Sequence, residues 1–384
     1  MTGPLVPMVA RPRSVAPTEL RAPSRDFMAP KPLPMIPAAP RPRSVVPVVP
    51  AEPDAGWRQW IAEQRLRGCT GESMVGTMTT AGWDAVISRA AIKRMEADPA
   101  YLAATRFQQL QRKLESVVGN LQKLWQLDPL YGVVEKRSHV SADEFEARYV
   151  RGCRPLVLTG HAQDWPALRC WSPADLRQRF GHLIVEIQAE RHADPRYEEN
   201  KLELRRSVRL SEFVDQVVAG GPTNDYYLTA NNEVLRRPEF APLLDDIGTL
   251  PPGCDRSQLP TKSSFWFGPA GTVTPLHHDT LMLFHTQVVG RKRWRLISPL
   301  EWPKLYNHHN VFSPIDLDRP DLHRYPAFGD VKVLDVVVEP GQTMFLPLAW
   351  WHQVSALDVS LSFSYSNLAR PNEFSYTNAD IRNW

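Results

Sequence analysis

Two histidines and one aspartate in this chain have the residue types and spacing of a metal site. His277 and Asp279 are separated by one residue, so on a β-strand both side chains would point to the same face. His352 lies 75 positions after His277. Two imidazoles and one carboxylate are the facial set that holds Fe(II) and leaves positions open for a cosubstrate and O₂. We therefore expect these three residues to bind Fe(II) and to form the catalytic centre.

The residues around these ligands indicate short strands that end at turns. The apolar run 281–284 follows the first pair, and Pro340 and Gly341 precede the segment that leads to the second histidine. In this combination the chain resembles the cupin-like, jumonji-type 2-oxoglutarate oxygenases, the group that includes the asparaginyl hydroxylase of hypoxia-inducible factor. The resemblance extends over roughly residues 128 to 370, and segments 154–160, 164–168 and 225–228 contribute to it.

That resemblance implies a double-stranded β-helix, Fe(II) as the metal, and 2-oxoglutarate and O₂ as cosubstrates. It places Lys292, fifteen residues after His277, at the family's oxoglutarate-binding position. The alternative is that residues 291–293 form a solvated basic turn. Thr274 and Tyr227 lie where the family has hydroxyl groups on the same carboxylate; the alternative is ordinary hydrogen-bonded core groups.

The chain departs from the family pattern near the expected cosubstrate. Leu283 stands where asparagine is common, and His285 follows where an apolar residue is usual. Strand parity predicts that His285 faces the pocket. There it would bind 2-oxoglutarate or substrate, orient a neighbouring group, or be a buried structural histidine. Ser364 aligns with another family asparagine, with Asn367 as the alternative.

Composition limits the partners and the compartment that we expect. A net charge of +3 and a pI of 8.6 do not indicate nucleic acid binding. No apolar segment reaches the ~18 residues of a membrane span, and the beginning of the sequence has no signal-peptide core. The four cysteines form no C-x-x-C pair and are expected to be free thiols of a reducing compartment. We expect a cytoplasmic protein with neither nucleic acid nor membrane partners.

Residues 1–53 differ in composition from the rest. They contain 14 of the 36 prolines, with seven Lys or Arg against three acidic residues. Proline at this density prevents both helix and sheet pairing, so we expect a disordered arm. It would be a spacer, a docking segment for a partner, or an organelle transit peptide, although its prolines oppose the amphipathic helix that a transit peptide needs.

Residues 54–127 are predicted to be helical. Asp54 and Asp84 are placed to cap helices, and the last helix has large apolar residues at steps of three and four. Such a stripe must be covered. It could pack against the catalytic domain or within a helical bundle, form a homodimer, or present substrate. Residues 128–384 are predicted to be the cupin-like JmjC catalytic domain, mainly β with flanking helices.

The expected activity is that of a 2-oxoglutarate-dependent dioxygenase that hydroxylates a protein or peptide side chain and releases succinate and CO₂. No accessory zinc motif or chromatin-binding motif occurs, which favours a protein hydroxylase over a histone demethylase. The alternatives are a small-molecule hydroxylase of the same chemistry and a non-catalytic cupin binding module. A cupin that uses another divalent metal would have no use for Lys292.

Overall fold

The computed structural model describes residues 52–230, 232–308 and 310–375. The predicted Pro-rich arm lies outside them apart from its last two residues. None of the described helices is both long enough and apolar enough to cross a membrane.

A helical region precedes the strands, as predicted. Each of its first three helices starts at a capping side chain that accepts backbone N–H groups, namely Asp54, Thr70 and Asp84. These helices share a core around Trp57 and Met78. The bounds are α1 (Ala55–Leu66), α2 (Gly71–Thr80), α3 (Ala85–Ala97) and α4 (Pro99–Trp125).

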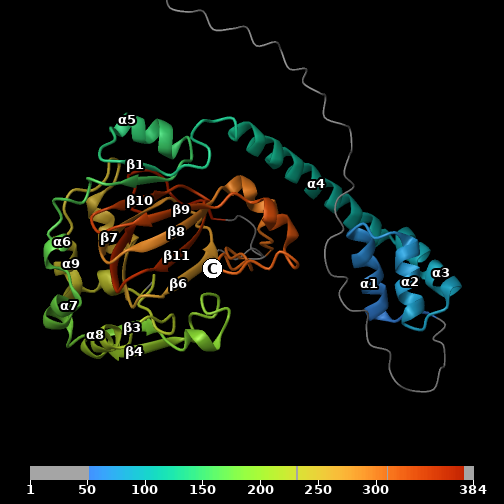
Figure 1. The fold of residues 1–384 in the computed structure, drawn as a ribbon, viewed down its shortest axis with the longest axis horizontal. Helices are drawn as coiled ribbons and strands as arrows, with labels where there is room; N and C mark the ends of the chain where they lie inside the picture. The colour runs from blue at the N-terminus through green and yellow to red at the C-terminus, as the bar shows by residue number, and fades with distance from the viewer. Residues whose placement is uncertain (1–51, 231, 309, 376–384) are drawn as a thin grey trace, which may run out of the picture. The chain divides into compact units, whose positions relative to one another are not determined.

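Two sheets form the double-stranded β-helix that was expected from the family resemblance, and we call this pair of sheets the cup (Figure 1). The larger has the order β1-β2-β10-β7-β12-β5 and the smaller β6-β11-β8-β9, and all pairs except β1–β2 are antiparallel. The strands of the larger sheet are β1 (Glu135–Arg137), β2 (Leu156–Leu158), β10 (Thr343–Leu346), β7 (Leu283–Val289), β12 (Ser360–Tyr365) and β5 (Ser263–Gly268). Those of the smaller are β6 (Val273–His277), β11 (Trp351–Ala356), β8 (Lys292–Ile297) and β9 (Leu334–Val338). The fold class is a double-stranded β-helix with flanking helices, as predicted.

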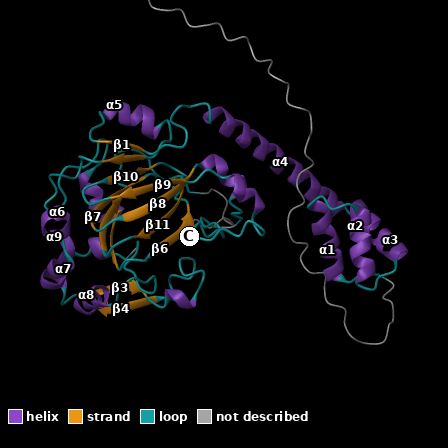
Figure 2. Cartoon of the chain, in the orientation of Figure 1, coloured by secondary structure: helices purple, strands orange, loops and turns teal. Residues whose placement is uncertain are grey.

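Helices lie along the outside of the larger sheet, where α6, α7 and α9 are seen beside β7 in Figures 1 and 2. The helices that flank the strands are α5 (Ala142–Glu144), the π-helical turn η1 (Phe145–Val150), α6 (Ala167–Cys170), α7 (Pro173–Phe180), α8 (Leu210–Ala219), α9 (Ala241–Asp245) and α10 (Leu259–Lys262). A separate hairpin pairs β3 (Ile184–Gln188) with β4 (Arg205–Arg209). Short 3₁₀ turns are η2 (Arg191–Ala193), η3 (Val234–Arg236), η4 (Pro238–Phe240), η5 (Arg256–Gln258), η6 (Pro299–Lys304) and η7 (Pro326–Asp330).

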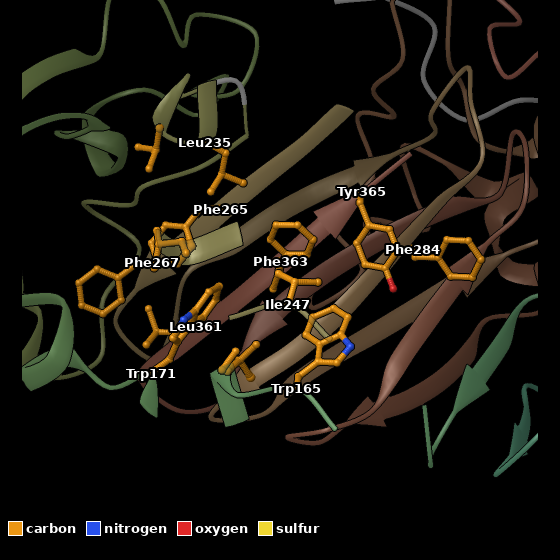
Figure 3. Close-up of a cluster of buried hydrophobic side chains, with 14 of the residues drawn as sticks. Trp165, Trp171, Leu235, Ile247, Phe265, Phe267, Phe284, Leu361, Phe363 and Tyr365 are labelled. Atoms are coloured by element: carbon orange, nitrogen blue, oxygen red, sulfur yellow. The ribbon is translucent and has the colours of Figure 1, made fainter. Parts of the chain in front are cut away.

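Strand β12 shows how the sheet separates its core from the cup. Leu361, Phe363 and Tyr365 belong to the aromatic core shown in Figure 3, which they share with Trp165 on the helical side. Since side chains alternate along a strand, Ser362 and Ser364 point the other way. The outer face is therefore packed with rings, and the inner face offers hydroxyl groups.

Segment 226–228 makes isolated bridges, Tyr227 with Gln188 and Leu228 with Phe267, and is not a regular strand. One expectation about the framework needs correction. Packing of the α4 stripe against the catalytic domain or within the helical bundle is wrong for the described residues, because Phe107 and its apolar neighbours along the helix are exposed there.

Candidate metal and cosubstrate site

The structure brings His277, Asp279 and His352 together. Their potential ligand atoms all lie within 4.8 Å of one another. His277 ends β6 and is the direct cross-strand partner of His352 on β11, and the centroids of their rings are 4.0 Å apart. Asp279 follows β6, with its Oδ2 3.7 Å from Nε2 of His352. This is the arrangement that the spacing predicted.

Backbone carbonyls fix the orientation of both imidazoles. Nδ1 of His277 lies 2.8 Å from the Pro275 carbonyl oxygen, and Nδ1 of His352 lies 3.0 Å from that of Trp350. A carbonyl only accepts, so each Nδ1 carries the proton and each Nε2 keeps a free lone pair. Burial also lowers the pKa of His352 well below its usual value, with a further contribution from His277. Both rings thus have Nε2, and not Nδ1, available as the ligand atom.

Asp279 is held by its backbone and is largely shielded from water, since 13% of its side chain is exposed. The backbone N–H of Ala349, in the turn before β11, donates to the Asp279 carbonyl over 3.2 Å. Burial raises the pKa of the Asp279 carboxyl, and His277 opposes that shift. A buried carboxylate that has no arginine or lysine partner among the described residues is stabilised by a bound cation.

Lys292 is a buried cation that lines the same cavity from β8, the strand that pairs with β11. Only 2% of the residue is exposed. Its Nζ donates to Tyr227 Oη over 3.0 Å and to Ser362 Oγ over 2.8 Å, and no carboxylate of the described residues pairs with it. Burial lowers its pKa to about 7. The alternative of a solvated turn holds for Arg291 and Arg293, which form outward salt bridges to aspartates, but not for Lys292.

One cavity of about 290 Å³ contains both groups. All eight residues predicted for the site are among those that line it, namely Tyr227, Thr274, His277, Asp279, His285, Lys292, His352 and Ser364. Sequence reasoning missed Ser362, because its only signal is strand parity with Ser364 once β12 is in register with β7.

His285 faces this cavity from β7, as strand parity predicted. Its ring lies 5.0 Å from that of Trp294 and 6.1 Å from that of Trp266. Burial, with a smaller effect of Lys292, lowers its pKa well below the usual value, so the imidazole is neutral. Its Nε2 is buried and lacks a hydrogen-bond partner among the described residues. Such an orphaned polar atom is expected where a ligand binds.

The structure decides between Ser364 and Asn367. Ser364 lines the cavity and accepts a hydrogen bond from Trp266 Nε1 over 2.7 Å. Asn367 donates instead to the carbonyl of Asp255 over 2.7 Å and does not line the cavity. The ring of His278 lies 4.6 Å from that of Trp351, and His278 is not part of the metal-ligand group.

Comparison with known proteins agrees with this geometry. The model of the cupin-like domain family matches residues 142–369, well over half of the chain. The chain belongs to the cupin-like family. This cupin-like protein is 32% identical to lysine-specific demethylase 8 of Xenopus tropicalis over 234 residues. This aligned segment is 59% of this chain and 50% of the relative.

Two further relatives have similar coverage. Lysine-specific demethylase JMJ30 of Arabidopsis thaliana is 32% identical over 247 residues, which is 60% of this chain and 54% of the relative. HSPB1-associated protein 1 of Homo sapiens is 30% identical over 225 residues, which is 53% of this chain and 46% of the relative. The cupin-like protein thus spans about half the length of the curated relatives it matches. These relatives and the domain match place it among the JmjC-type cupins, which use Fe(II) and 2-oxoglutarate.

The residues present fit both groups. Two available Nε2 atoms and a largely shielded carboxylate within 4.8 Å of one another suit Fe(II). A buried ammonium with hydroxyl groups but no counter-ion suits the distal carboxylate of a dicarboxylic acid. A metal and a 2-oxo acid therefore both find partners in one cavity.

Proposed function

We propose that this cupin-like protein is an Fe(II)- and 2-oxoglutarate-dependent oxygenase that hydroxylates a side chain of a protein or peptide. The observation that carries the proposal is the single cavity that combines the His277–Asp279–His352 cluster with a buried Lys292, which has no carboxylate partner among the described residues. A set of three metal ligands alone would fit many cupins. The buried cation adds a requirement for an anionic cosubstrate.

The bound groups would supply the oxidation. With Fe(II) in place, O₂ and 2-oxoglutarate react with a C–H group of the substrate to give the C–OH product, succinate and CO₂. The chain's part is to bind and orient these reactants and to exclude water from them.

Each part of the cavity has a distinct task in this proposal. Lys292, Tyr227 and Ser362 would bind the distal carboxylate, because their polar atoms already converge. Burial raises the pKa of Tyr227, so its hydroxyl stays protonated. Since Lys292 donates to its oxygen, Tyr227 is free to donate its own proton to a carboxylate. His285 would give the cosubstrate or substrate a further hydrogen bond through Nε2.

The other end of the cavity is suited to a polar chain. It is lined by residues of η3 and α10, among them Glu233, Arg236 and Lys262, which are partly or largely exposed. A side chain that enters from a protein surface would meet this charged rim before it reaches the metal. Asn232 also lines the cavity, where its amide donates to the carbonyl of Phe265 over 2.7 Å.

Binding of both groups can be tested without knowledge of the substrate. Anaerobic protein is titrated with Fe(II) and then 2-oxoglutarate, and the visible metal-to-ligand charge-transfer band of the chelate is recorded. We expect the band in the wild type and in Arg293→Ala, an exposed control next to Lys292. Iron binding without the band would indicate a cupin of different chemistry, and absence of both would indicate a binding module that has lost turnover.

The product distinguishes hydroxylation from demethylation. Two of the relatives are named lysine-specific demethylases, and oxidative demethylation also begins with hydroxylation of a C–H group. Proteome-wide mass spectrometry should compare the wild type with a His277→Ala control. Peptides that gain one oxygen atom support the proposal. Loss of methyl groups together with formaldehyde release would replace it with demethylation, and turnover of metabolites alone would replace it with a small-molecule hydroxylase.

A further inference from the structure

Helix α4 has a large apolar stripe on its exposed side. The six residues of the stripe are between 50% and 74% exposed: Phe107, Leu110, Leu114, Val117, Leu121 and Leu124. Contiguous apolar surface of this extent marks an interaction site on a soluble protein.

The contacts that α4 makes within its own chain use another face. Gln108 Nε2 donates to the Leu66 carbonyl over 2.6 Å, and Gln122 hydrogen-bonds to buried Glu301 on η6. Trp125 packs edge-on against Trp350, with ring centroids 5.8 Å apart. The covered face is thus the more polar one, the reverse of an ordinary surface helix.

The stripe follows a strict 3-4-3-4-3 spacing, which averages 3.5 residues per turn. This is the seam of a coiled coil, because an α-helix with 3.6 residues per turn keeps such a seam in line only by supercoiling around another helix. The occupant is therefore expected to be helical. The 14 prolines of residues 1–53 make a sequence of that composition a poor source of such a helix.

We infer that α4 pairs with α4 of a second copy of this chain in an antiparallel two-helix interface. The stripe is complementary to itself when reversed. Phe107 then meets Leu124, Leu110 meets Leu121 and Leu114 meets Val117, each pair being counted twice by the two-fold axis. Each layer of the antiparallel pair then combines two different residues, such as Phe107 with Leu124. In a parallel pair, Phe107 would pack against Phe107 of the second copy.

The flanking positions and the chain direction agree with the antiparallel pair. Lys113 would lie opposite Asn120, and Arg106 opposite Leu127, so that no like charges face each other. The cupin domain follows closely after Trp125 in each copy. An antiparallel pair puts the two cupin domains at opposite ends, while a parallel pair would crowd them at one end.

The area is sufficient for a stable dimer. Six half-exposed side chains, together with the stems of their neighbours, would bury roughly 600–800 Å² per helix, close to the roughly 800 Å² per partner of stable complexes.

Sedimentation of the full chain over a range of concentrations tests the inference. We expect a dimer, and we expect Leu114→Glu to raise its dissociation constant at least about 100-fold, because a charge would be buried in the central layer twice. Gln109→Glu adds the same charge to an exposed position outside the stripe and should leave the dimer intact. Circular dichroism checks that both variants fold. A monomeric wild type, or a Leu114→Glu variant that dimerises normally, would overturn the inference.

Disulfide trapping tests the direction. Phe107→Cys should not cross-link to its own copy, because the two sites would lie about 25 Å apart along the antiparallel pair. A Phe107→Cys/Leu124→Cys double variant should form intermolecular disulfides, with the wild type and its four natural cysteines as the background. Cross-linking by the single variant would show a parallel pair and overturn the proposed register.

Discussion

The interior of the cup and the surface of α4 distribute side chains in opposite ways. The cup encloses a largely shielded carboxylate together with buried imidazoles and a buried ammonium group. Helix α4 leaves leucines exposed and covers glutamines. Each arrangement is costly in the isolated chain, because buried charge and exposed apolar surface are both unfavourable. The difference indicates what each region binds: ions inside the cup, and an apolar helix outside it.

The largest effect is expected from removal of the buried carboxylate. Asp279→Ala should lower the affinity for iron by more than ~10–100-fold, because it removes a direct ligand. A decrease of that size is typical when only a hydrogen bond to a ligand is lost. Asp330→Ala removes an exposed carboxylate and is the matched control. Iron content after desalting is the measurement. Normal iron in Asp279→Ala would remove this residue from the ligand set.

The same substitution in the two regions tests their contrast directly. Leu296→Ala, in the fully buried core of the smaller sheet, should lower the free energy of unfolding by about 2–5 kcal/mol. Leu110→Ala, on the stripe, should change it by less than about 0.5 kcal/mol at concentrations low enough to keep the chain monomeric. Urea unfolding measures both. Equal losses would mean that the stripe is covered within one chain.

The buried ammonium can be removed without a large change in volume. Lys292→Met should weaken 2-oxoglutarate binding about 10–100-fold, the range expected for loss of charge-assisted hydrogen bonds, and should spare the metal. Arg291→Ala, on the same turn but paired outward with Asp358, should bind normally. Calorimetry with Mn(II)-loaded protein gives the affinity. An unchanged affinity in Lys292→Met would assign the anchor to another residue.

The pKa of Lys292 predicts a smaller, graded effect. Burial lowers this pKa to about 7, so the ammonium is present below pH 7 and is lost as the pH rises through that value. Affinity for 2-oxoglutarate should therefore fall by up to about tenfold per pH unit above 7. The same titration on Lys292→Met should lack this slope. A flat profile in the wild type would show that the free site keeps its proton.

Local signals in the sequence were enough for the parts of the site that lie on one strand. The His277–Asp279 spacing predicted a shared face, and parity predicted that His285 faces the cavity. Resemblance to the family was needed for Lys292, because a basic residue in a basic turn gives no sign of burial by itself. The helices that start at Asp54 and Asp84 were predicted from their capping residues.

The features of the fold and the site that could not be predicted depend on contacts between segments that are distant in the sequence. Ser362 reaches Lys292 only because β12 and β8 curve around one cavity. Tyr227 lies outside the regular strands and is held by a single bridge to Gln188, beside the bridge of Leu228 to Phe267. Exposure of the α4 stripe could not be predicted from its periodicity, since a 3-4 spacing specifies that an apolar face exists and not what covers it. Which face packs is decided by partners such as Glu301 and Trp350.

The hydrogen bond from Ala349 to the Asp279 carbonyl joins the two chain segments that carry the ligands. Ala349 also adopts a left-handed backbone, with φ of 61°, which the surrounding turn enforces. Polypeptide atoms alone hold this connection. Chelation should accordingly be reversible, so that iron stripped by EDTA returns to a cup that has kept its shape and needs no refolding.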